Sequence, residues 1–149
     1  MSKTIKYRVW DKTRKKMSPV ATIHFRDDGS ALTIMIDPAP KGPHIDLVEG
    51  ENAVLMQFTG LLDKNGCEIY EGDILFSHAL DISRTNDDYA IVDAGVSLPA
   101  GSLLFAHIKT DPQKVPVAFS DTGSVEVIGN VYENQDLLEQ QRAQCEESK

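Results

Sequence analysis

Short runs of alternating apolar and polar residues dominate the chain, and turn-forming residues bound each run. In the first run Ile5, Tyr7 and Val9 alternate with Lys6 and Arg8, which predicts a strand with one apolar and one basic face. The same pattern predicts strands over residues 4–10, 20–25, 31–36, 45–48, 53–59, 73–78, 89–93, 103–109, 115–119 and 124–132.

Glycine, proline and Asx residues separate these runs. Asn65-Gly66 is a hairpin signal, because both residues tolerate the positive φ of a tight turn, and Asp28-Gly29 is a second such signal. Three prolines in residues 37–43 exclude a central strand or helix there. Further breaks are expected at Gly95, Pro99, Gly101 and Pro112.

The end of the chain follows a different pattern. Residues 124–132 are expected to place Val125, Val127, Gly129 and Val131 on one face of a strand. Asn134 is then expected to cap a helix over residues 135–146. Many short strands and one terminal helix predict a mostly β fold, barrel-like or sandwich-like, with a short C-terminal helix.

Three stretches resemble the YopX family. They are IKYRVWDK at 5–12, LMQFTGLLDKNG at 55–66 with EIYEGDIL at 68–75, and VEVIGNVYEN at 125–134. Two features depart from the family pattern: Gln135 stands where a proline is usual, and residues 77–117 match nothing in it.

The resemblance implies a β-rich fold, a barrel-like part beginning near Glu68, and a bacteriophage or prophage origin. We expect a single YopX-like unit over 1–149, with an N-terminal β subdomain over about 1–60, a barrel-like subdomain over about 61–134, and a helical tail over 135–149. The family supplies no catalytic or binding residues. We expect structural roles for its motif residues Trp10, Gly60, Asp63, Asn65, Gly66, Tyr70, Gly72, Asp73, Gly129 and Asn130.

The net charge of −8 argues against sequence-independent nucleic-acid binding, which depends on Lys and Arg displacing counterions from phosphates. The charge is uneven, however, with a basic start and an acidic end that either attract each other or form two solvated surfaces. The candidate nucleic-acid surface at the start consists of Lys3, Lys6, Arg8, Lys15 and Lys16.

The sequence contains only weak matches to catalytic motifs. Asp121-Thr122-Gly123 matches the aspartic-protease triplet, but it occurs once, follows Ser120, and reads better as a turn. His24, His44, His78 and His107 have no zinc-site spacing, and no catalytic residue, cofactor or metal is expected.

The positions of Cys67 and Cys145 give little reason to expect a disulfide. No apolar run approaches the ~20 residues of a membrane span. We therefore expect the protein in the bacterial cytoplasm. We expect a non-enzymatic phage accessory protein that binds a protein partner or a second copy of itself. The alternatives are a nucleic-acid-binding module that uses the basic first strand, and a hydrolase centred on Asp121.

Overall fold

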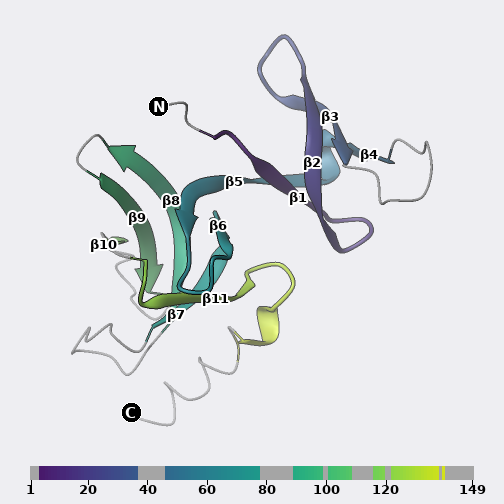
Figure 1. Cartoon of the computed structure of the whole chain (residues 1–149). Helices are drawn as coiled ribbons and strands as arrows, with labels where there is room; N and C mark the ends of the chain where they lie inside the picture. The colour runs from purple at the N-terminus through teal and green to yellow at the C-terminus, as the bar shows by residue number, and fades with distance from the viewer. Residues whose placement is uncertain are drawn as a thin grey trace. The chain divides into compact units, whose positions relative to one another are not determined.

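The computed structural model describes residues 4–36, 46–77, 89–98, 101–108, 116–119, 122–137 and 139 (Figure 1). The chain divides into two compact units: residues 5–57 form the N-terminal unit, and residues 1–4 with 58–149 form the C-terminal unit. All pairings between the described strands are antiparallel. The prediction of a mostly β fold is confirmed.

The N-terminal unit is built from consecutive strand neighbours. Its elements are β1 (Tyr7–Asp11), β2 (Lys16–Phe25), β3 (Ala31–Ile36), β4 (Asp46–Glu49), the 3-10 helix η1 (Gly50–Asn52) and the first part of β5 (Ala53–Leu62). The strand order is β4-β3-β2-β1-β5, so β5 returns to pair with β1. Its core consists of Val9, Ile34, Ile36 and Val48, packed against Val20, Ile23, Ala53 and Leu55.

The C-terminal unit begins with the end of β5, which pairs with β6 (Glu68–Tyr70). Its larger sheet has the order β10-β9-β8-β7-β11. These strands are β7 (Asp73–Ser77), β8 (Tyr89–Leu98), β9 (Gly101–Ile108), β10 (Pro116–Phe119) and β11 (Val125–Asn130). The core consists of Ile69, Leu75, Ala90, Val92 and Val125, with Leu61 and Val127 packed against it.

The described strands do not close into a barrel, because no pairing joins the two end strands of either sheet. Alternation of apolar residues indicates strands, but it carries no information on whether the last strand pairs with the first. Residues 77–117 supply β8 and β9, which form the longest hairpin ladder among the described strands.

Several strand details differ from the sequence expectations. Gly95 and Gly101 were expected to break the chain, but both lie in the β8–β9 ladder, where Gly95 pairs with Leu104. A bulge between Val127 and Gly129 shifts the register of β11, so the expected common face of these residues is wrong. A bulge adds one residue to one strand and thereby reverses the alternation beyond it.

At the C-terminal end, Gln135–Leu137 and Glu139 are helical. The side-chain oxygen of Asn134, the expected helix cap, accepts a hydrogen bond from the N–H of Asn130 at 3.1 Å. This donor belongs to β11 and not to the first turn of the helix. The rest of the expected helix, and the proline-rich residues 37–43, lie outside the described residues.

Candidate functional site

The turn between β5 and β6 is organised by one buried carboxylate. Asp63 is 6% exposed, and its Oδ1 accepts hydrogen bonds from the N–H groups of Asn65 (2.8 Å) and Cys67 (2.9 Å). Its Oδ2 accepts a third, at 3.0 Å, from the N–H of Val127 in β11. Gly66 takes the positive φ of 81° that completes the turn. Asp63 therefore joins a local turn to a strand 64 residues away.

The ionisation of Asp63 reflects these contacts. Burial alone would raise its pKa, but the backbone N–H groups of Val127, Cys67 and Asn65 and the charge of Lys64 together lower it below the ordinary value of 3.8. Lys64 is itself held by Glu126, with Nζ 2.6 Å from the carboxylate. A carboxyl group with a lowered pKa is a poor proton donor near neutral pH, so this arrangement suits structure better than acid catalysis.

A second buried carboxylate fixes the next turn. Asp73 is fully buried, and its Oδ2 accepts the N–H of Tyr70 at 2.8 Å. Between them Gly72 has a φ of 79°; its N–H donates to the carbonyl of Val92, and its own carbonyl accepts the N–H of Val131. The aromatic ring of Tyr70 packs 5.5 Å from that of Phe58, centroid to centroid.

The end of β11 forms a third such arrangement. Asn130 is buried, and its Oδ1 accepts the N–H groups of Tyr132 (3.0 Å) and Glu133 (2.9 Å). The Asn134 side chain lies against Gly129 so closely that a Cβ on this glycine would collide with it. In all three arrangements the motif side chains hold backbone N–H groups of the same chain.

Four of the five predicted nucleic-acid-binding cations are described, and these four do not lie together on one surface. Lys3 lies outside the described residues, and Lys6 precedes β1, about 17 Å along the strand from Lys15 and Lys16. Arg8 is half-buried, and its Nη2 lies 3.6 Å from the sulfur of Met56. Only Lys15 and Lys16 lie together, at the turn between β1 and β2.

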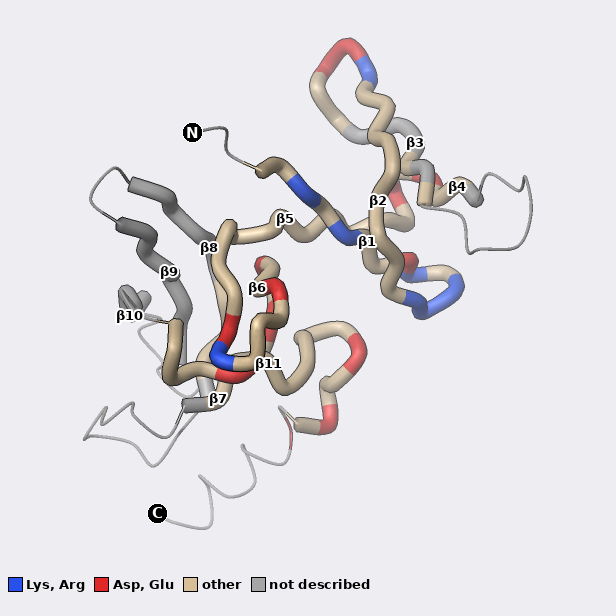
Figure 2. Tube along the Cα trace, viewed as in Figure 1, with Lys and Arg blue, Asp and Glu red and all other residues tan. Residues whose placement is uncertain are grey.

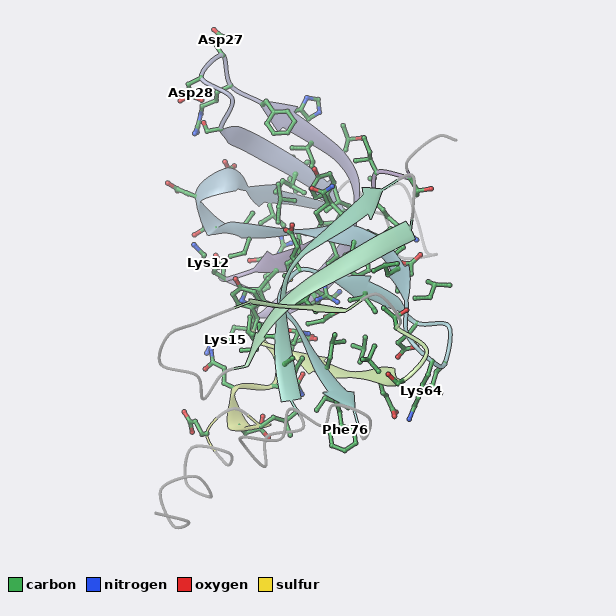
Figure 3. All side chains as sticks on the ribbon, turned by 90° about the vertical axis from the view of Figure 1, so that its left-hand side faces the viewer. Lys12, Lys15, Asp27, Asp28, Lys64 and Phe76 are labelled. Carbon is green, nitrogen blue, oxygen red and sulfur yellow. The ribbon has the colours of Figure 1, made fainter. Side chains whose placement is uncertain are left out.

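This turn gathers more cations than the predicted set. Lys12, Arg14, Lys15 and Lys16 are all exposed, and we call these four residues the basic turn (Figure 2). Figure 3 labels Lys12 and Lys15, and the Nζ of Lys12 donates a hydrogen bond to the backbone carbonyl of Glu51 at 3.3 Å. Sequence reasoning omitted Lys12 and Arg14 from the candidate surface, although Asp11 before them is the Asx-turn signal that could have indicated a common turn.

The basic turn is fixed from below by Asp11, which is 4% exposed. Its Oδ1 accepts the N–H groups of Thr13 (2.9 Å) and Arg14 (3.0 Å), and its Oδ2 lies 3.6 Å from the Arg14 guanidinium. Lys12 donates from its backbone N–H to the carbonyl of Asn52 at 2.9 Å. The cations therefore stand on a turn of defined shape.

The hairpin of β2 and β3 carries one of three exposed large apolar residues described in this unit; the others are Ile5 (70%) and Leu47 (48%). In the outer half of β2, Ala21, Thr22, His24 and Phe25 are all exposed, and the Phe25 ring is 61% exposed. At the tip, Asp28 accepts hydrogen bonds from the N–H (2.8 Å) and hydroxyl (2.6 Å) of Ser30. This tip is marked by Asp27 and Asp28 in Figure 3.

The structure describes two of the remaining candidate residues. His24 is exposed in β2, His107 lies in β9, and His44, His78 and Asp121 are outside the described residues. Among the residues that the structure describes, no three His, Cys, Asp or Glu side chains are placed to hold a metal ion. No helix in the same part of the chain is long and apolar enough to cross a membrane.

The fold and its turns define a class: a small antiparallel β protein whose motif residues fix backbone geometry. The chain belongs to the YopX family, whose model, described as YopX protein, matches residues 6–139. It is also similar to a solved structure, protein EF1440 from Enterococcus faecalis, with 27% identity and a TM-score of 0.58; the match covers 92% of this chain and 99% of that one. No curated protein matches the sequence.

Proposed function

We propose that this chain is a non-enzymatic accessory protein of a bacteriophage or prophage, working in the bacterial cytoplasm by binding a protein partner through the β2–β3 hairpin. The observation that carries the proposal is the Phe25 ring, 61% exposed near the tip of that hairpin. Aromatic residues are enriched at protein interfaces, where burying the ring removes a large apolar surface from water.

The surroundings of Phe25 favour a protein as the ligand. The outer half of β2 contains Ala21, Thr22 and His24, which are exposed, while the charged residues Arg26 and Asp28 follow the end of the strand. An aromatic anchor with a polar rim is the usual composition of a protein interface. The partner expected here offers an apolar pocket of aromatic size, and a second copy of the chain is one protein that could supply it.

The phage origin and the cytoplasmic location rest on the resemblance to YopX proteins and on the composition of the chain. The absence of enzyme activity is part of the same proposal. Turnover of any substrate that disappears in Asp121→Asn would overturn it, because that residue is the centre of the hydrolase alternative.

The test compares tagged wild-type protein with Phe25→Ser, both purified from host cells during phage induction. Leu62→Ser is the matched control, because Leu62 is a similarly exposed apolar residue outside the hairpin, at 49%. A stoichiometric partner retained by the wild type and by Leu62→Ser but lost from Phe25→Ser supports the proposal. Equal retention by all three proteins overturns it, and light scattering shows whether the partner is a second copy.

A further inference from the structure

We infer that the basic turn is a separate binding surface for the phosphate backbone of a nucleic acid. Lys12, Arg14, Lys15 and Lys16 place four exposed cations within five consecutive residues. The last backbone pair of the β1–β2 ladder joins Asp11 to Lys16, so residues 12–15 extend beyond the paired strands. Such clustered cations neutralise successive phosphates and release their counterions.

The geometry of the turn favours binding over simple solvation. Lys15 has a φ of 51°, a left-handed conformation that costs a lysine about 1 kcal/mol and that glycine or asparagine adopts more easily. A cation therefore occupies the position at which an uncharged residue would be more stable. Strain of this kind at a surface turn is typical of positions that serve a contact.

Asp11 offsets only part of the charge of the turn. It is buried beneath the turn, where it accepts the N–H groups of Thr13 and Arg14 and its Oδ2 lies 3.6 Å from the Arg14 guanidinium. Lys12 reaches the backbone carbonyl of Glu51 with its Nζ at 3.3 Å, a contact to a neutral group. With one carboxylate against four cations, the turn keeps a net positive charge on a chain whose net charge is −8.

The composition of the turn selects a nucleic-acid backbone rather than an acidic protein segment. Protein interfaces combine an apolar core with few lysines, whereas the only uncharged residue between Asp11 and Lys16 is Thr13, which is polar. The neighbouring aromatic residue, Trp10, is half-buried in β1 and not fully open for stacking on bases. The surface thus fits phosphates, independent of base sequence.

The distance from Phe25 separates this surface from the one proposed above. β2 runs from Lys16 to Phe25, so the basic turn and the aromatic ring lie at opposite ends of one strand, about 30 Å apart. A substitution at one end should leave the other undisturbed. Failure of the protein-partner proposal and failure of this one are therefore distinguishable.

The test is the anisotropy of a labelled DNA duplex titrated with protein over a series of salt concentrations. If all four cations contact phosphates, the slope of log K against log salt should be about −3.6. Lys15→Asn/Lys16→Gln should reduce the slope by about 1.8 and weaken binding by roughly ten- to a hundredfold at low salt. Asn suits the left-handed backbone at position 15, so this variant should fold, which circular dichroism checks.

The control Lys6→Gln/Arg26→Gln removes the same total charge outside the basic turn and should bind like the wild type, as should Phe25→Ser. Absent or salt-insensitive binding overturns the inference. So does an equal loss in the control, which would indicate a general charge effect. Polyglutamate that displaces the duplex at equal charge concentration would assign the turn to acidic proteins instead.

Discussion

Replacing Asp63 with asparagine tests the role of the buried carboxylate in the C-terminal unit. One asparagine oxygen can still accept the N–H groups of Asn65 and Cys67, but the amide nitrogen then faces the N–H of Val127, and that bond is lost. A hydrogen bond to a charged group contributes about 1.5–3 kcal/mol, and the two retained bonds weaken without the charge. We expect a loss of about 2–4 kcal/mol in the free energy of unfolding.

The assay is urea unfolding followed by two signals. Trp10, the only tryptophan, lies in the N-terminal unit, whereas far-ultraviolet circular dichroism reports strands of both units. Asp63→Asn should lower the midpoint seen by circular dichroism, since a small domain has only about 5–15 kcal/mol of stability. Comparing the two signals shows whether the units unfold together, which decides whether one free energy describes the chain.

The effect should also depend on pH in a defined direction. Because the pKa of Asp63 in the folded chain lies below 3.8, its ionised form stabilises the fold fully above that value. The stabilisation is lost as pH falls through the folded pKa. The deficit of Asp63→Asn relative to the wild type should therefore be constant near neutral pH and shrink below about pH 3.8.

Asp28→Asn is the matched control. Hydrogen bonds from the Ser30 side chain and backbone also lower the pKa of Asp28, but this carboxylate is exposed on a hairpin tip, where water replaces lost bonds. Its midpoint should change far less than that of Asp63→Asn. An equal effect of the two substitutions, or a deficit of Asp63→Asn that is unchanged in acid, would refute the reasoning.

Two further substitutions test the packing around other motif positions by urea unfolding. Gly129→Ala should lower the free energy of unfolding by about 1–3 kcal/mol, because the added methyl group collides with the Asn134 side chain. Adding Asn134→Ser should recover part of this loss. If it recovers none, the collision is not the cause. Thr59→Val should lower the free energy of unfolding by about 1–2 kcal/mol, because the buried hydroxyl donates a hydrogen bond to the carbonyl of Ile69 at 2.7 Å. Thr59→Ser keeps the hydroxyl and should therefore be more stable than Thr59→Val. Equal losses in the two variants would exclude the hydrogen bond as the reason.

Alternating apolar positions predict most of the strands, because one face of a half-buried strand packs on a core. The alternation of Ile5, Tyr7 and Val9 with Lys6 and Arg8 predicts β1, and the Asp28-Gly29 signal lies at the turn between β2 and β3. The start of β2 was missed, since Lys16, Ser18 and Pro19 carry no apolar alternation. Their strand conformation comes from pairing with β1, which a local pattern does not contain.

The candidate surfaces were harder to predict for the same reason. Arg8 and Lys15 look equivalent in the sequence, yet pairing of β1 with β5 places Arg8 beside Met56, while Lys15 stands on an open turn. The exposure of Phe25 likewise depends on how far the β2–β3 hairpin extends beyond its core. Charge and apolarity are readable from the sequence, but their accessibility depends on contacts between distant residues.

The hydrogen bond from Val127 to Asp63 has a consequence for the order of folding during synthesis. Every strand pairing of residues 5–57 lies within that range, so the N-terminal unit can form as soon as this segment leaves the ribosome. The Asp63 carboxylate receives its hydrogen bond from the N–H of Val127 only after the next 64 residues have been synthesised. The C-terminal unit therefore completes last, and a ribosome that stalls before Val127 leaves a nascent chain with one finished unit and one open sheet.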